Sequence, residues 1–487
     1  MSRGHSVQTE SLPPHVDHRF RQQVARAHPQ ASSCRRLVKE WQYGRMLAHV
    51  EPTGGPTRGT KVNRARHRRA RAAWWPTLIP IGLILASEYK FRSRGIGEAI
   101  GGGIDATIAI EIGSYGLAVL YLYRRFGIRP PRRVPSPVLL LAWLFVFYMA
   151  MSVLWTPFPQ FAAVRAAQLL VTAAVCQVLA TRAEREDLYR MAHVFIGVVV
   201  VSVGIGVALP LPRTPNTQDR FNWLYVHPVT AGIFLGIALL LALSFVLPGG
   251  LPRRWRLPVY LVVIVVLGTA LVATGTRGAA AGCLAGVAMF LLTARGARGR
   301  AEFLLMAIPG AVVAVLAFGD WLIDFATRGE SVQRLETLNS RTDLWSFAFD
   351  AVSEKPIFGN GMSAARGLFL ESIGLGGGHN VFVNILVEGG IVGTALFCLL
   401  CFVTMTIQLA LTRVRAIRTD AALLLGLMTF LLVDGLTADM MAGAANVASI
   451  WLFLIVAWTS VIFRKPVGPE VRHGDDRTPV ATVSEIS

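Results

Sequence analysis

The polar stretch 340–393 carries the residue types best suited to chemistry. It contains Arg341 in SRTDLW, His379 and Asn380 in GLGGGHN, and Glu388 in NILVEGGIVG. An imidazole has an unperturbed pKa near physiological pH, so His379 is a candidate general base, and a solvated interfacial histidine is the alternative. Asn380 precedes an apolar run, where an asparagine favours helix capping over direct catalysis.

Arginines suited to phosphate recognition recur in three polar segments. Arg220 lies in PRTPNTQDRFNWLYVHP, Arg277 lies in TGTRGAAAG, and Arg341 precedes a predicted surface helix over 342–352 that ends before Pro356. A guanidinium offers a planar fork of donors to phosphate oxygens, and an arginine beside a helix N-terminus forms an anion site. We therefore predict an anion-binding role for these arginines, with a solvated loop residue as the alternative for Arg341.

For the other polar residues near apolar segments, the sequence leaves the role open. Arg165 either extends to the membrane interface or joins the site. Glu388 is predicted inside the membrane, where a carboxylate is costly without a partner, so it either orients a site residue or pairs with a buried arginine. His227 is a minor candidate, and Asp434 and Asp439 have no predicted role beyond an interfacial position.

The composition predicts an all-α polytopic membrane protein. Of the 487 residues, 53% are hydrophobic and 16% are charged, whereas soluble proteins carry about a quarter charged residues. Runs of about 20 apolar residues cross a bilayer as helices, because lipid offers the backbone no hydrogen-bond partners. We expect about twelve transmembrane helices, near 74–89, 104–123, 136–155, 161–180, 191–210, 229–248, 258–275, 279–294, 302–319, 383–411, 421–437 and 447–463. A large external loop, 320–382, is expected to carry short helices.

Arginine-rich connectors alternate with connectors poor in Lys and Arg, which predicts the orientation. The rich ones are 121–133, 181–190, 252–256, 294–300, 412–418 and the tail that begins at 463. The positive-inside rule places both termini in the cytoplasm and the stretch 340–393 outside, with KFRSR (90–94) as an exception. No internal repeat is visible, which disfavours a transporter built from two repeated halves.

The two ends of the chain are predicted to flank a single membrane domain. Residues 1–72 read as a disordered basic cytoplasmic tail that lies on anionic lipid, 73–463 as the transmembrane domain, and 464–487 as a C-terminal cytoplasmic tail. The formal net charge of +19 is better explained by topology signals than by nucleic-acid binding. The CLLC of Cys398 and Cys401 favours packing over redox chemistry, and no cofactor is predicted.

Several of these motifs resemble one family. RTDLWSFAFDAVSEKPIFGNGM followed by GHNVFVNILVEGGIVG resembles the signature region of the O-antigen ligase and O-antigen/exopolysaccharide polymerase superfamily. TGTRGAAAG resembles the Ser-Arg-Gly turn of that family, with Thr276 in place of serine. RFNWLYVHPVTAG resembles its His-Pro-Asn helix start, with Val229 in place of asparagine. The resemblance covers 215–395.

The resemblance implies a metal-independent glycosyltransferase at the outer face of the plasma membrane. It implies a polyprenyl-diphosphate-linked glycan as donor and a glycan, lipid or protein hydroxyl as acceptor, in a polymerase or a ligase. Arg220 and Arg277 would bind the diphosphate, Arg341 would bind it or anchor the loop, and His379 would activate the acceptor. Because no nucleophilic carboxylate pair is evident, attack by the hydroxyl would invert the anomeric centre.

A transporter of a lipid-linked sugar or a small anion is the alternative from another class. A transporter places its charges near the bilayer midplane and often contains repeats. The candidate Arg and His residues instead lie at one predicted face, which favours the enzyme.

Overall fold

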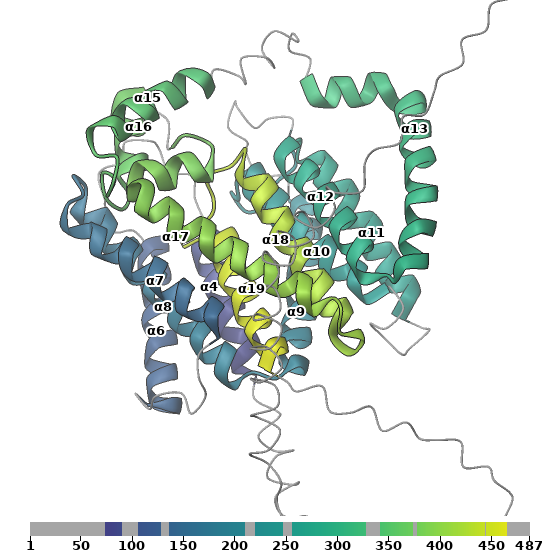
Figure 1. The fold of residues 1–487 in the computed structure, drawn as a ribbon, viewed down its shortest axis with the longest axis horizontal. Coiled ribbons are helices and arrows are strands. Elements are labelled where there is room, and N and C mark those ends of the chain that lie inside the picture. Colours follow the sequence, from purple (N-terminus) through teal and green to yellow (C-terminus); the bar gives the residue numbers. More distant parts are fainter. Residues whose placement is uncertain are drawn as a thin grey trace, which may run out of the picture. The chain divides into compact units, whose positions relative to one another are not determined.

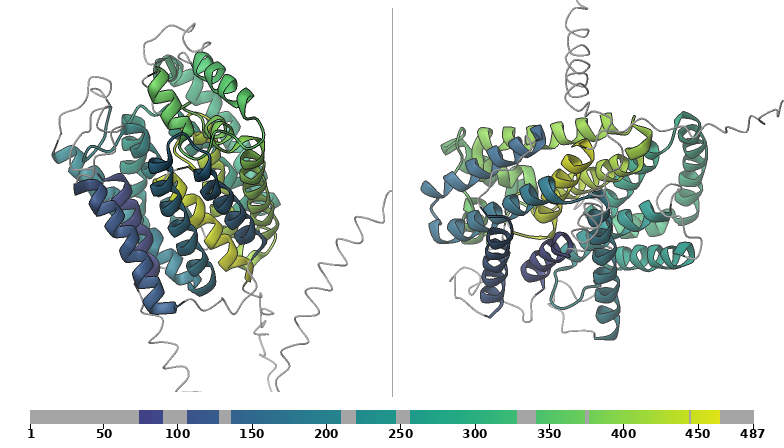
Figure 2. Two further views of the ribbon diagram at one scale, coloured as in Figure 1. Left: turned by 90° about the vertical axis from the view of Figure 1, so that its left-hand side faces the viewer. Right: turned by 90° about the horizontal axis from the view of Figure 1, so that it is seen from below.

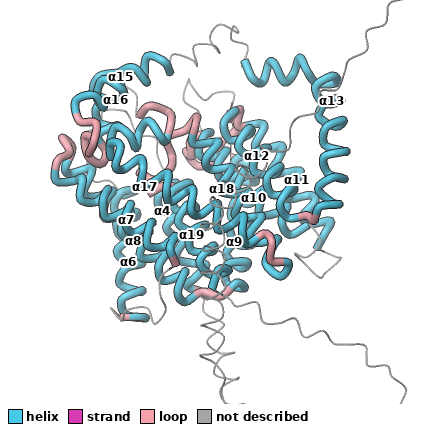
Figure 3. The backbone as a smooth tube through the Cα atoms, viewed as in Figure 1, coloured by secondary structure: helices cyan, strands magenta, loops and turns pink. Residues whose placement is uncertain are grey.

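The computed structural model describes residues 74–89, 106–127, 136–209, 220–246, 256–327, 341–373, 377–443 and 445–464. The secondary structure of these ranges is helical, with 14 α-helices joined by loops and turns and no strand (Figures 1 and 3). The predicted all-α class is therefore confirmed for the described part of the chain. The two predicted tails, 1–72 and 464–487, lie outside the described residues except for Arg464.

All twelve predicted apolar segments coincide with helices. Ten helices are long and apolar enough to cross a membrane, and Trp75–Glu88 and Leu257–Ala273 are shorter apolar helices. The corresponding elements are α4 (Trp75–Glu88), α6 (Ala106–Phe126), α7 (Pro137–Met151), α8 (Pro159–Arg182), α9 (Arg185–Ala208), α10 (Pro228–Val246), α11 (Arg256–Ala273), α12 (Arg277–Ala294), α13 (Ala297–Thr327), α17 (Val381–Leu411), α18 (Arg418–Gly435) and α19 (Val447–Arg464). Within the predicted external loop, α15 (Arg341–Glu354) and α16 (Ala364–Ile373) are the expected short helices.

The helices differ in how deeply they are buried. Helices α10 and α19 are buried along most of their length, and α19 runs between other helices (Figure 2). Helix α13 lies at the edge of the bundle with most of its described side chains exposed, bends at Phe318 and continues to Thr327 (Figure 1). Exposed apolar side chains are expected here, since lipid replaces protein around the periphery of a membrane bundle.

The packing of α12 against α18 rests on glycines. Gly278, Gly282 and Gly286 recur every four residues on α12. A Cβ on Gly286 would lie 2.7 Å from the Gly426 carbonyl oxygen, and one on Gly282 would lie 2.8 Å from that of Phe430. Small residues at this spacing let two membrane helices approach closely. The contact fixes the first turn of α12, where Arg277 lies, against the last turn of α18.

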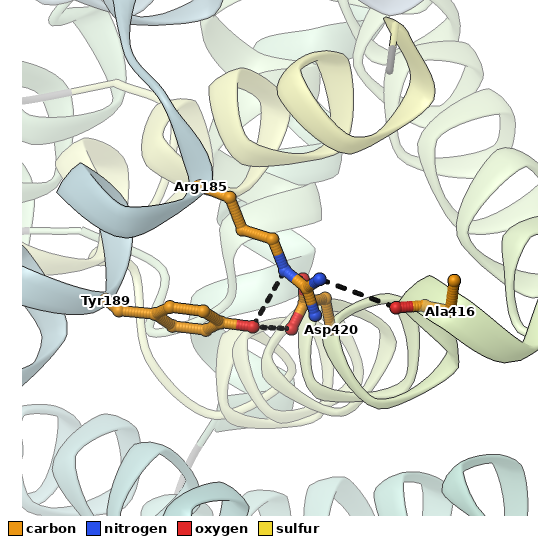
Figure 4. Close-up of polar contacts among 4 residues, drawn as sticks. All are labelled: Arg185, Tyr189, Ala416 and Asp420. Carbon is orange, nitrogen blue, oxygen red and sulfur yellow. Dashed lines mark hydrogen bonds and ion pairs between the residues drawn. The ribbon is translucent and has the colours of Figure 1, made fainter. Parts of the chain in front are cut away.

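Two of the arginine-rich connectors meet at one end of the bundle, here called the basic end (182–190 and 412–420). Arg185, at the start of α9, contacts the Asp420 carboxylate of α18, and its Nη1 donates to the Ala416 carbonyl at 3.4 Å (Figure 4). Tyr189 donates its hydroxyl to Asp420 and accepts from Arg185 Nε at 2.9 Å (Figure 4). The grouping agrees with the alternation of connectors predicted from the sequence.

We expect Gly282→Val to destabilise the protein by about 1–3 kcal/mol, because the new side chain would collide with the backbone of α18. Thermal unfolding of the detergent-solubilised protein measures this change. Gly268→Val on α11 is the matched control, since a Cβ there meets nothing within 4 Å. Equal melting temperatures for the two variants would contradict the proposed importance of the α12–α18 contact.

Candidate active site

Helix α17 is broken at Gly390, whose φ of 60° and ψ of −161° are not helical. Segment 356–361 supplies partners for the backbone groups that the break leaves open. Its bonds join Asn360 N to Val387 O at 2.8 Å, Gly361 N to Glu388 O at 2.8 Å, Ile391 N to Pro356 O at 2.9 Å and Val392 N to Ile357 O at 3.2 Å. Gly359 has a φ of +69°, and a Cβ there would lie 2.4 Å from Gly390 N, so PIFGNGM needs this glycine.

The Glu388 side chain holds the start of α16, the helix that follows this segment in the chain. Its carboxylate accepts hydrogen bonds from the backbone N–H groups of Ser363 and Ala365, at the first turn of α16. A carboxylate is favourable at a helix N-terminus, where the N–H groups lack intrahelical partners. Arg165 lies close enough for its charge to attract that of Glu388. Of the two predicted interpretations of Glu388, these contacts support pairing with a buried arginine.

Charged residues from several elements act on Arg165. Its guanidinium interacts electrostatically with Glu388 on α17, Asp439 after α18 and Glu111 on α6, and also with Arg366 on α16. Glu111 in turn accepts from Gln168 Nε2 at 2.8 Å. Arg165 is therefore part of a charged network with Glu388 and Asp439.

Arg220 is fixed at the turn between α11 and α12. Its Nε donates to the Thr274 carbonyl at 2.7 Å, and its Nη2 donates to Thr276 Oγ1 at 2.9 Å. Thr276 Oγ1 donates to the Pro228 carbonyl at 3.0 Å. Threonine thus provides a hydroxyl at the position where the family that the sequence resembles has serine. Arg277 is the next residue, so the turn brings the two predicted diphosphate-binding arginines together.

His227 lies where four segments meet at the end of the bundle opposite the basic end, here called the site end (220–228, 274–277, 377–380 and 436–443). Its imidazole is close enough to interact electrostatically with Arg220, His379 and Asp439. Burial, the Arg220 charge and His379 hold the pKa of His227 below its ordinary value. Its Nδ1 accepts from Val229 N at 3.3 Å, which leaves the proton of the neutral ring on Nε2. His227, a minor candidate in the sequence analysis, thus lies near His379, the candidate general base.

The loop of His379 is held in a tight conformation. His379 has a φ of +48°, in the left-handed region that favours glycine. Gly378 accepts from Trp345 Nε1 of α15 at 3.1 Å and donates to Asn384 Oδ1 of α17 at 2.9 Å. These contacts hold the backbone next to His379 from two helices.

Asn380 caps α17, as predicted. Its Oδ1 accepts from Phe382 N at 2.9 Å and Val383 N at 3.3 Å. Its Nδ2 donates to the Leu436 carbonyl at 3.2 Å, which ties the start of α17 to the end of α18. Asn380 is thus fully engaged with backbone groups, and its position determines where the neighbouring His379 lies.

Arg341 is the first residue of α15, and its side chain lies outside the described residues, as does Ser340. The helix ends at Glu354, before Pro356, as predicted. Leu344 and Ala348 of α15 are buried in a cluster with Phe369 of α16 and Val383 and Val387 of α17. This cluster packs α15 against the bundle, as the spacing of the apolar residues in α15 predicted.

Two acceptors near this loop had no role in the sequence interpretation. Asn384 Nδ2 lies 3.5 Å from Asp439 Oδ2, and a Cβ on Gly377 would lie 2.3 Å from the same oxygen. Asp434 is buried against Gly278 of α12. In the sequence, the only signal for these two aspartates is their position near the ends of apolar segments. Their contacts could not be predicted, because they form where α17 and α18 pack together in the folded protein. Among the described residues, no three His, Cys, Asp or Glu side chains are grouped to hold a metal ion.

Residues 261–398 match the protein family described as O-Antigen ligase. The match spans α11 to the middle of α17 and includes Arg277, Arg341, His379 and Glu388. For residues 261–398 this match confirms the resemblance found in the sequence. No curated protein matches the chain.

Replacing Glu388 by alanine removes the acceptor of two backbone N–H groups and leaves Arg165 without this attraction. We expect a loss of about 2–5 kcal/mol in the free energy of unfolding. Thermal unfolding in detergent measures it, with Glu371→Ala, an exposed position on α16, as the matched control. A Glu388→Ala protein as stable as the Glu371→Ala control would refute this anchoring role.

Proposed function

We propose that the protein is a membrane glycosyltransferase that moves a glycan from a polyprenyl diphosphate to an acceptor hydroxyl. The observation that carries the proposal is the convergence of Arg220 and Arg277 on one turn, with His227 and His379 beside it. The O-antigen ligase match supports the same class of reaction. Either a surface polysaccharide polymerase or an O-antigen-type ligase fits this chemistry.

Each group has a defined part in the proposed reaction. The guanidinium groups of Arg220 and Arg277 bind the diphosphate and stabilise the charge that develops as it leaves the anomeric carbon. His379 accepts the proton of the acceptor hydroxyl, whose oxygen forms the new glycosidic bond. Attack from the face opposite the leaving group inverts the anomeric centre. Arg341 contributes to diphosphate binding or anchors the loop.

The proposed topology has twelve crossings of the plasma membrane, with both termini in the cytoplasm and the site end outside. The gathering of arginine-rich connectors at the basic end supports this orientation. A lipid-linked donor then presents its diphosphate at the outer interface, level with the first turn of α12. Glu388 supports the site by fixing α16, and Arg165 supports it through its charge interaction with Glu388, so neither residue needs to bind substrate, a role that we also considered for both from the sequence.

A transporter of a lipid-linked sugar or a small anion is the second candidate. Its charged residues would be expected near the middle of the spanning helices. Arg277 is the first residue of α12, and His227 and His379 precede α10 and α17. Groups placed at helix ends suit chemistry at an interface better than passage through the membrane.

Arg277→Ala and His379→Ala are each expected to reduce glycan transfer at least 100-fold, since each removes a group that acts in the transition state. Transfer is measured in membranes of the producing strain that lack the wild-type protein. Lys355→Ala removes an exposed positive charge after α15 and is the control. Wild-type transfer by His379→Ala would remove the base role, and wild-type transfer by Arg277→Ala would remove the diphosphate contact.

A chelator added to the purified protein is expected to leave transfer within about twofold of the untreated rate, because arginines neutralise the diphosphate in this mechanism. Transfer by the purified protein from a polyprenyl-diphosphate-linked donor, assayed with and without EDTA, measures the effect. Inhibition that a divalent cation restores would contradict the metal-independent mechanism.

A further inference from the structure

Asp439 occupies a position in the site that the proposed reaction does not yet use. It follows α18 and is partly exposed. Asn384 Nδ2 lies 3.5 Å from its Oδ2, and the same asparagine accepts from Gly378 N at 2.9 Å. Asn384 therefore links Asp439 to the backbone next to His379.

The fit between Asp439 and the loop is close. Gly377 has a φ of +152°, and a Cβ there would lie 2.3 Å from Asp439 Oδ2. Any residue larger than glycine would push the carboxylate away from the loop. The Gly-rich run before His379 thus leaves room for the Asp439 carboxylate beside the loop that carries the proposed base.

The α11–α12 turn and Asp439 belong to different segments of the site end. Arg220 and Arg277 lie at the α11–α12 turn, whereas Asp439 follows α18 and interacts electrostatically with Arg165 and Glu388. His227 is close enough to interact with both Arg220 and Asp439, and also with His379. The two histidines therefore lie in the region that joins the Arg220 turn to Asp439.

We propose that Asp439 binds the acceptor, as a carboxylate that accepts hydrogen bonds from hydroxyl groups of the acceptor sugar. The proposal rests on the proposed function, and it divides the site into a donor half at Arg220 and Arg277 and an acceptor half at Asp439. A carboxylate would repel the donor diphosphate, so Asp439, which follows α18 and is not part of the α11–α12 turn that carries Arg220 and Arg277, suits a neutral, hydroxyl-bearing ligand.

The carboxylate has the capacity for this role. Two carboxylate oxygens offer about four lone-pair directions, and Asn384 takes one of them through a long hydrogen bond. Hydrogen bonds from hydroxyl groups to an ionised carboxylate are shorter and stronger than those between neutral groups. Binding the acceptor here places its hydroxyls next to His379, the group proposed to take the proton.

The test separates donor binding from transfer in the Asp439→Asn protein. Binding of undecaprenyl diphosphate to the full chain in nanodiscs probes the donor half, and glycan transfer in membranes of the producing strain probes the whole site. We expect binding within about twofold of wild type and transfer reduced by about 10- to 100-fold. Asp350→Asn, an exposed aspartate on α15, is the control and should change neither quantity.

Three outcomes would overturn the proposal or its basis. Wild-type transfer by Asp439→Asn overturns the acceptor role, and so does a loss of undecaprenyl diphosphate binding equal to the loss of transfer. If Arg277→Ala binds undecaprenyl diphosphate and transfers glycan as wild type does, the proposed function itself fails. If Asp439→Asn does not fold, Asp439→Glu takes its place in the same binding and transfer measurements. That variant keeps the charge but moves the carboxylate oxygens by one methylene.

Discussion

At Gly390 the backbone of α17 leaves the helical conformation, and segment 356–361 hydrogen-bonds to the groups that the break leaves open. Unpaired backbone groups cost several kcal/mol each in a membrane, so the break and the segment depend on each other. The Glu388 carboxylate, two residues before the break, holds the first turn of α16. Through these bonds the spanning helix positions the short helices of the loop, and with them the segment that carries His379.

Two further contacts bring the halves of the site together. The glycines of α12 allow α18 to approach closely, which places Arg277 near the end of α18. Asn380 then ties the start of α17 to that same end through the Leu436 carbonyl. The α11–α12 turn adds Arg220, held by the Thr274 carbonyl and the Thr276 hydroxyl. The proposed donor and acceptor halves thus come from helices that are distant in sequence and share one end of the bundle.

Local signals in the sequence predicted much of this arrangement. Each apolar run forms a helix because lipid leaves the backbone no other partners, Asn380 caps α17, and α15 ends before Pro356. The role of Glu388 stayed open, because its partners at Ser363 and Ala365 depend on how the loop folds back. The proximity of His227 to His379 and the contact of Asn384 with Asp439 depend on which loops meet, which no local pattern specifies.

A structure of the protein with undecaprenyl diphosphate in nanodiscs tests the central claim most directly. The account predicts that the diphosphate lies at the α11–α12 turn, within hydrogen-bond distance of Arg220 and Arg277, with its terminal phosphate facing the space beside His379. A diphosphate held at the basic end of the bundle, or away from both arginines, would contradict it.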